Sequence, residues 1–376
     1  MNLKLIVAII ACLILIPFIL YSIVVSRENE FEEFYFGVDV AYAELDKIEA
    51  LVDQVTNYTN FFVIGSTGIS HNQENLNQTI AYLVNHDLSY SVFTANAARL
   101  PLINDTVSSY GNGFMGLYFD DEVGGRQLDR TDHQSVLSAV NYSDAAAQFI
   151  DYVGFWLNAE FNFNRSLSFL VPSEFRLFTS DYALYWFDYK AGYDVVLGQF
   201  GWNYSRQLNV ALCRGAATIQ DKEWGVMIAW TYTEPPYLGS GEELFDDLVL
   251  AYENGAKYVV VFDTNEDYTA STLLDEHFDA MERFWQYTKH NPRSSNLLDD
   301  RVAFVLPKDW AYGFRGPDDK IWGLWETDEL VSSISEDLGV LLDENGSKLD
   351  IIYDDNLALD NTYKEYIFWN GTTITP

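Results

Sequence analysis

Short apolar segments alternate with longer amphipathic segments along most of this chain. Four apolar runs rich in aromatic and β-branched residues predict β-strands at residues 34–40, 61–65, 90–94 and 114–120. Apolar residues at helical spacing predict helices at residues 42–55 and 75–85. Because strand and helix alternate, we expect a parallel sheet.

The alternation continues through the middle of the chain. Further strands are predicted at 175–179, 194–200, 224–232 and 256–262, and further helices at 145–160, 182–191, 206–220, 242–253 and 271–289. Eight strand–helix units between residues 31 and 290 match the size and order of a (β/α)₈ TIM barrel. The sequence therefore predicts an α/β barrel in this region.

Two regions depart from the alternation. Residues 123–142 are polar and lack periodicity, which is typical of a lid or binding loop. After a turn-rich linker that starts at residue 291, strands at 302–306, 349–353 and 365–369 and a helix at 328–342 are predicted. We therefore expect a small C-terminal α/β domain over residues 291–376.

The N-terminus carries an uncharged apolar segment at residues 5–25. A helix of this length can cross a bilayer core about 30 Å thick, so residues 1–30 are predicted to be a membrane anchor. The charges flanking it favour a cytoplasmic N-terminus and an extracytoplasmic barrel. A cleaved signal peptide is the alternative. Eight Asn-X-Ser/Thr sequons, which matter only on an exported chain, support export: Asn57, Asn77, Asn104, Asn141, Asn164, Asn203, Asn345 and Asn370.

Composition excludes several classes of function. A chain that is 48% hydrophobic can bury a large core, and its net charge of −34 argues against nucleic acid as a partner. Cys213 is the single cysteine outside the anchor, so no intrachain disulfide is expected there. The five histidines lack metal-ligand spacing, the acidic pairs lack a complete calcium-loop pattern, and no nucleotide-binding fingerprint appears. No metal or cofactor is therefore predicted.

An acidic cluster ends the fourth predicted strand. The apolar run from residue 114 is followed by Asp120, Asp121 and Glu122. Alternation along a strand puts Asp120 and Glu122 on one side and Asp121 on the other. Catalytic residues of barrels lie at the C-terminal ends of strands, so this cluster is the first candidate site. A solvated acidic loop is the alternative.

The same reasoning gathers further candidates at one rim of the barrel. Two facing carboxyl groups with aromatic walls suit glycoside hydrolysis, in which one acid protonates the leaving oxygen and the other attacks or stabilises the sugar cation. The catalytic candidates are Glu122, Glu234 and Asp120. The substrate-binding candidates are Asp39, Asp121, Asp181, Tyr182, Gln199, Trp202, Trp230, Tyr232, Asp263, Arg315 and Trp322. Aromatic residues that only pack the core are the competing interpretation.

Two resemblances bear on these roles. With Glu122 and Glu234 at the predicted ends of strands four and seven, the chain resembles retaining barrel glycosidases, which implies acid/base and nucleophile roles respectively. Asp121 departs from that group, which usually has Asn before the strand-four Glu. The segment 116–122 also resembles the strand-four motif of chitinase-type barrels, which implies that Asp120 assists Glu122 as the acid. Met115 and Tyr118 depart from the acidic positions of that motif.

A second dense motif, residues 307–325, joins a strand to a helix in the predicted C-terminal domain. Arg315 can pair with an acid or bind sugar hydroxyls there. We expect this loop either to fold over the barrel mouth or to pack as an interdomain plug. Taken together, the sequence predicts a membrane-anchored extracytoplasmic glycoside hydrolase acting on a surface or environmental carbohydrate. The alternative is a non-enzymatic glycan-binding or structural protein on a degenerate barrel.

Overall fold

The computed structural model describes residues 33–110, 113–129, 135–165, 176–293 and 300–376. The predicted anchor at residues 1–30 lies outside these ranges. Among the described residues, no helix combines the length and apolar character needed to span a bilayer.

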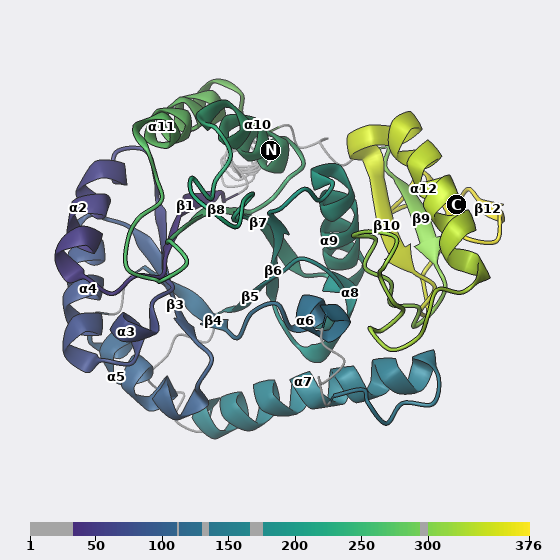
Figure 1. Ribbon diagram of the computed structural model, residues 1–376, viewed down its shortest axis with the longest axis horizontal. Coiled ribbons are helices and arrows are strands. Elements are labelled where there is room, and N and C mark those ends of the chain that lie inside the picture. The colour runs from purple at the N-terminus through teal and green to yellow at the C-terminus, as the bar shows by residue number, and fades with distance from the viewer. Residues whose placement is uncertain (1–32, 111–112, 130–134, 166–175, 294–299) are drawn as a thin grey trace, which may run out of the picture.

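Eight parallel strands form a closed barrel, which confirms the fold predicted from the sequence (Figure 1). The ring closes where β1 pairs with β8, with Val38 opposite Val261. The strands are β1 (Tyr35–Val40), β2 (Phe61–Ile64), β3 (Ser89–Thr94), β4 (Phe114–Phe119), β5 (Arg176–Asp181), β6 (Val195–Phe200), β7 (Glu223–Ile228) and β8 (Tyr258–Asp263).

Helices surround the barrel. They are α2 (Leu45–Val55), α3 (Thr67–Ser70), α4 (Gln73–Asn85), α5 (Leu100–Tyr110), α6 (Val123–Asp129), α7 (Tyr142–Arg165), α8 (Tyr185–Ala191), α9 (Arg206–Gln220), α10 (Gly241–Glu253) and α11 (Asp275–His290). The 3₁₀ turn η1 (Ala97–Arg99) leads into α5. Helix α5 was not among the predicted elements. Helix α6 occupies the start of the segment predicted to be a loop, because a distant carboxylate, Asp181, binds its first backbone N–H groups.

The seventh strand ends earlier than predicted. β7 stops at Ile228 rather than at residue 232, and the chain then turns back on itself. The N–H groups of Thr231 and Tyr232 both donate to the carbonyl of Tyr237, at 2.7 and 2.9 Å. The loop after β7 therefore contains Trp230, Tyr232 and Glu234. The alternation of side chains along a strand does not determine their directions.

Two hydrophobic layers follow from side-chain alternation. Tyr118 of β4 points into the barrel, where it packs with Phe61, Phe178 and Tyr258, whereas Leu117 and Phe119 face the helices. Aromatic contacts fill the barrel interior, with the Phe178 and Tyr258 rings 5.0 Å apart. The open end, where the strands terminate, is left for a site.

A second sheet follows the barrel. Its strand order is β10 (Leu349–Tyr353), β9 (Val302–Leu306), β11 (Glu365–Phe368) and β12 (Thr373–Ile374), and the sheet carries α12 (Glu329–Asn345) and the turn η2 (Gly346–Lys348). The first three strands are parallel and were predicted, while the short antiparallel β12 was not. Figure 1 shows this sheet beside α9.

A buried ion network joins α9 to the second sheet. The Arg214 Nε donates to Asp350 at 2.7 Å, and Arg301 donates to the other oxygen of the same carboxylate. The backbones approach closely here, since a Cβ on Gly215 would lie 2.5 Å from the carbonyl oxygen of Ile351. Glycine is thus required at the point where helix and strand meet.

We expect Asp350→Asn to lower the free energy of unfolding by about 3–5 kcal/mol, because it leaves two buried guanidinium groups without their counter-charge. The measurement is urea unfolding followed by circular dichroism. The matched control is Glu242→Gln, which breaks the solvent-exposed pair with Arg283 and should leave the midpoint unchanged. Equal effects of the two substitutions would show that the buried network does not stabilise the junction.

Candidate functional site

A cavity of about 440 Å³ opens at the C-terminal end of the barrel strands. It lies where parallel barrels place their chemistry, and its size is in the range of small-ligand sites. Two carboxyl groups and four aromatic rings line it, together with small residues of the loops after β1 and β2: Asp39, Asp121, Phe93, Tyr118, Phe262, Tyr268, Ala41, Ala43, Gly65, Ser66, Thr67 and Gly68.

Asp39 forms the floor of this mouth cavity. Its side chain is on β1 and only 2% exposed, and its Oδ1 has no hydrogen-bond partner in the described structure. A Cβ on Gly65 would lie 2.1 Å from that oxygen, so the glycine lets the β2 loop pack directly against the carboxyl group. Burial, followed by the charges of Asp121 and Asp263, raises the pKa of Asp39 well above its usual range.

Asp121 faces the same cavity. Burial is the largest cause that raises the pKa of Asp121 to about 7; Glu122 and Asp120 add to it, and Arg126 opposes it. A carboxyl group with this pKa still holds a proton near neutral pH. It can therefore donate that proton to a leaving group, which is the property required of a general acid.

Glu122 is held between β4 and β6. Its backbone is left-handed, with φ of 55°, and its N–H donates to the carbonyl of Ser180 at 2.8 Å. The Gln199 amide donates to Glu122 Oε1 at 2.9 Å and to the Ser180 hydroxyl at 3.0 Å. The predicted proximity of Gln199 and Glu122 is therefore observed, and the amide fixes the direction of this carboxylate.

Tyr268 shares the cavity wall with Asp39 and Asp121. Burial and then the charges of Asp121, Glu122 and Asp39 raise the pKa of the Tyr268 hydroxyl. The side chain is nonetheless 56% exposed and is part of the cavity wall. It sits in the loop after β8 and was not predicted from sequence. Tyr118 was missed as a wall residue too, although its inward strand position could have identified it.

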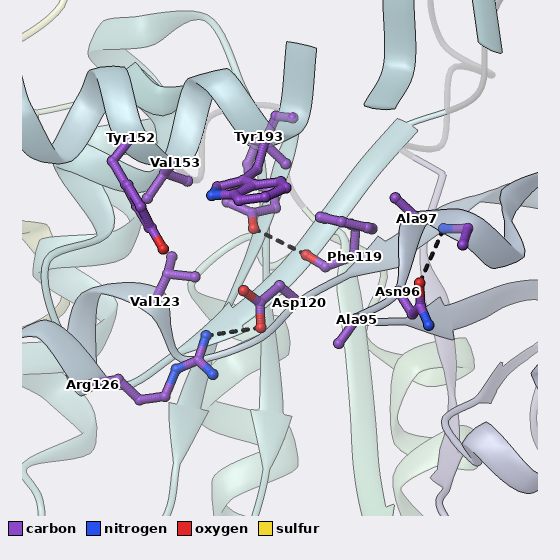
Figure 2. Close-up of a pocket in the computed structure, with 13 residues that line it drawn as sticks. Ala95, Asn96, Ala97, Phe119, Asp120, Val123, Arg126, Tyr152, Val153 and Tyr193 are labelled. Atoms are coloured by element: carbon purple, nitrogen blue, oxygen red, sulfur yellow. Dashed lines mark hydrogen bonds and ion pairs between the residues drawn. The ribbon is translucent and has the colours of Figure 1, made fainter. Parts of the chain in front are cut away.

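Asp120 turns away from Glu122. β4 ends at Phe119, and Asp120 and Glu122 both adopt left-handed φ values, so the alternation expected of a continuing strand does not apply. The Asp120 carboxylate accepts from Arg126 Nη2 at 2.8 Å and lines a separate cavity (Figure 2). The sequence placed Asp120 beside Glu122; the structure pairs it with Arg126 instead.

Asp181 and Asp263 are buried and hold loops in place. Asp181 accepts from the N–H groups of Gly124, Gly125, Tyr182 and Ala183 at 2.6–3.1 Å. Asp263 accepts from the Thr272 N–H and the Ser271 hydroxyl at 2.7 and 2.9 Å in the β8–α11 loop. Both side chains are fully buried, and they shape the rim rather than presenting oxygen atoms to the cavity.

Glu234 is exposed in the turn after β7, and the described hydrogen bonds of Glu122 do not include it. Of the predicted aromatics nearby, Trp230 donates from Nε1 to the Thr264 carbonyl at 2.9 Å, with its ring 6.0 Å from that of Phe262 in the cavity wall. Tyr232 and Trp202 are exposed on the neighbouring loops. Glu122 has an amide partner on β6, and its catalytic pairing with Glu234 stays a prediction.

The loop at residues 307–325 packs against the barrel, as the predicted plug would, and none of its residues lines the mouth cavity. Trp322 has no exposed surface, packs 4.7 Å from the Phe187 ring and accepts a hydrogen bond from Gln127 through its carbonyl. It therefore packs the junction and offers no ring face to a ligand. Arg315 reaches the barrel rim, where it pairs with Asp129 and Asp319 and lies 5.5 Å from the centre of the Tyr182 ring.

Comparisons with known proteins add the fold and nothing finer. No family model matches the sequence, and no curated protein does. An endo-β-1,4-mannanase from Thermotoga petrophila is 10% identical with a TM-score of 0.46, over 73% of this chain and 82% of that one. The pneumococcal virulence factor StrH, studied for N-glycan recognition and hydrolysis, is 11% identical with a TM-score of 0.44, over 72% and 86%. A 3-deoxy-D-arabino-heptulosonate 7-phosphate synthase from Thermotoga maritima is 9% identical with a TM-score of 0.38, over 69% and 86%.

These similar structures include barrel enzymes of different chemistry, and at such identities the likeness concerns the barrel alone. They assign neither a family nor a chemistry to this chain. Within the described ranges, no group of three or more acidic, histidine or cysteine side chains is arranged to hold a metal ion. The chemistry of the site therefore has to be argued from its own residues.

We expect the stability difference between the wild type and Asp121→Asn to depend on pH. The folded-state pKa of about 7 exceeds the unfolded value of about 4, so this group's contribution to stability is complete below pH 4 and is lost as the pH rises through 7. Relative to the variant, the wild type should lose about 1–4 kcal/mol of unfolding free energy between pH 4 and 8. Urea unfolding at several pH values measures this loss, and a constant difference would contradict the raised pKa.

Proposed function

We propose that this protein is a glycoside hydrolase whose site is the mouth of the barrel. The observation that carries the proposal is the pair formed by Asp121 and Glu122. The first has a pKa of about 7, and the second is oriented by the Gln199 amide. A protonated carboxyl group beside a second, directed carboxylate is what cleavage of a glycosidic bond requires.

In this proposal Asp121 is the acid. Its proton passes to the glycosidic oxygen as the bond from that oxygen to the anomeric carbon breaks, and the leaving sugar departs as an alcohol. The Glu122 carboxylate stabilises the positive charge that develops on the anomeric carbon and ring oxygen. Water then adds to that carbon, and its released proton restores Asp121. This assignment keeps Glu122 in the reaction but gives the acid's role, which the sequence predicted for Glu122, to its neighbour Asp121.

The cavity walls support a carbohydrate as the substrate. Phe93, Phe262 and the exposed Tyr268 present apolar ring faces beside carboxyl groups. Sugars combine C–H faces that pack on aromatic rings with hydroxyls that need hydrogen-bonding partners, so such mixed walls suit them. Asp39 lines the same cavity, although its unpaired oxygen is covered by the loop at Gly65.

We also propose that the barrel is exported and tethered by residues 1–30. The support is the apolar segment at residues 5–25 and the position of the sequons. Of the acceptor asparagines in the described ranges, Asn57, Asn141, Asn203 and Asn370 are exposed, and the other three are partly exposed. Asn164 lies where side chains are not described.

We expect the soluble part to hydrolyse at least one glycan in a library screen, and we expect Asp121→Asn and Glu122→Gln each to lower kcat/KM by about 10²–10⁴-fold, since proton donation and charge stabilisation would be lost. The matched control is Glu234→Gln, which changes an exposed carboxylate on the β7 loop in the same way and should retain activity.

The outcomes separate the candidate functions. Full activity in Asp121→Asn and Glu122→Gln would remove both residues from catalysis. If Glu234→Gln lost as much activity as Glu122→Gln, the result would support the catalytic pair of Glu122 and Glu234 that was predicted from the sequence. Glycan binding without any hydrolysis would favour the non-enzymatic alternative.

A further inference from the structure

A second cavity, of about 550 Å³, lies outside the barrel wall at the end of β4 (Figure 2). The proposed mechanism does not use it. Its walls come from the loop after β3, the end of β4, α6, α7 and the start of β6: Ala95, Asn96, Ala97, Ala98, Phe119, Asp120, Val123, Arg126, Tyr152, Val153, Trp156, Leu157 and Tyr193. We call it the outer cavity.

Helix α7 supplies an aromatic wall. Tyr152 and Trp156 are four residues apart, so they share one face of the helix, and their rings meet edge to face at 6.5 Å. The adjoining residues Val153 and Leu157 are buried in the core, whereas Tyr152 and Trp156 are 42% and 47% exposed. Rings half open to solvent beside a cavity are available to a ligand.

The opposite side of the outer cavity is polar. The Asp120 carboxylate and the Arg126 guanidinium are paired at 2.8 Å, and both are partly exposed. Together they offer hydrogen-bond acceptors and donors at adjacent points, as two neighbouring sugar hydroxyls require. Because the pair is neutral as a whole, it does not call for a charged ligand.

The outer cavity adjoins the mouth cavity. Asp120 lines the former and Asp121 lines the latter, and consecutive Cα atoms are about 3.8 Å apart. The two neighbouring carboxyl groups therefore lie on different sides of the strand end. A ligand that occupied both cavities would pass over the end of β4.

We propose that the outer cavity binds further sugar units of the same chain that is cleaved at the mouth, so that the substrate is a neutral polysaccharide. This inference rests on the proposed function and specifies its substrate class. The net charge of −34 disfavours a polyanionic chain, and a uronate in the outer cavity would compete with Asp120 for Arg126. Aromatic rings beside a neutral ion pair suit uncharged pyranose units.

The test compares oligosaccharides of two to six units from mannan, cellulose and chitin, with oligogalacturonates as the acidic series. Binding to the inactive Glu122→Gln protein is measured by calorimetry, alone and combined with Trp156→Ala. The matched control is Phe155→Ala, which removes an aromatic ring that is 63% exposed on the same helix and does not line the outer cavity. Thermal unfolding establishes that each variant is folded.

We expect affinity for one neutral series to rise with chain length in the parent and in Phe155→Ala. We expect Trp156→Ala to lose about tenfold of that rise in affinity, which corresponds to about 1.4 kcal/mol of stacking. An unchanged length dependence in Trp156→Ala would overturn the inference while leaving the mouth site intact. Tighter binding of the acidic series would also overturn it. If no series binds and the wild type cleaves none, the proposed function itself fails.

Discussion

The site depends on one buried carboxylate, Asp181, at the end of β5. It accepts hydrogen bonds from the N–H groups of Gly124 and Gly125 in the first turn of α6 and from two N–H groups that follow its own strand. These donors would otherwise be left unpaired at a helix start and in a tight loop. The carboxylate therefore fixes where the chain turns after β4. Glu122 lies immediately before that turn, so its direction toward Gln199 follows from a contact between neighbouring strands.

The close packing of carboxyl groups at the barrel mouth explains how side chains of the same chemical type can take different roles. Asp39 and Asp121 line one cavity, where burial and neighbouring negative charges raise the pKa of both. Protons are retained on some members, and the hydrogen bond from the Gln199 amide directs another. Division of roles between a proton donor and a carboxylate thus results from burial and hydrogen bonding.

The local pattern of apolar and polar residues was sufficient to predict the barrel, but it was insufficient to predict the arrangement of the residues at its rim. Strands buried on both faces and helices with one apolar face can be recognised from the spacing of apolar residues in the sequence. Helix α9, for example, lies at the residues predicted for it. Helix α6 was missed because two glycines disfavour it and Asp181, distant in sequence, stabilises it. The prediction that Asp120 and Glu122 lie on one side of a continuing strand was wrong because both residues leave the strand conformation. Trp230, Tyr232 and Glu234 were misplaced because backbone bonds to Tyr237 end the extended run early.

The second sheet is coupled to the site through the same helix. Gln127 of α6 donates to the carbonyl of Trp322, and Arg315 pairs with Asp129 at the end of α6. Trp322 in turn packs on Phe187 of α8, while Arg214 ties α9 to β10. Helix α6 has only seven residues, too few to be stable in isolation, so it needs these contacts as well as Asp181. Its C-terminal partners belong to the loop between β9 and α12, and its N-terminal partner belongs to β5. This loop therefore helps to hold the chain that carries Asp120, Asp121 and Glu122 in place.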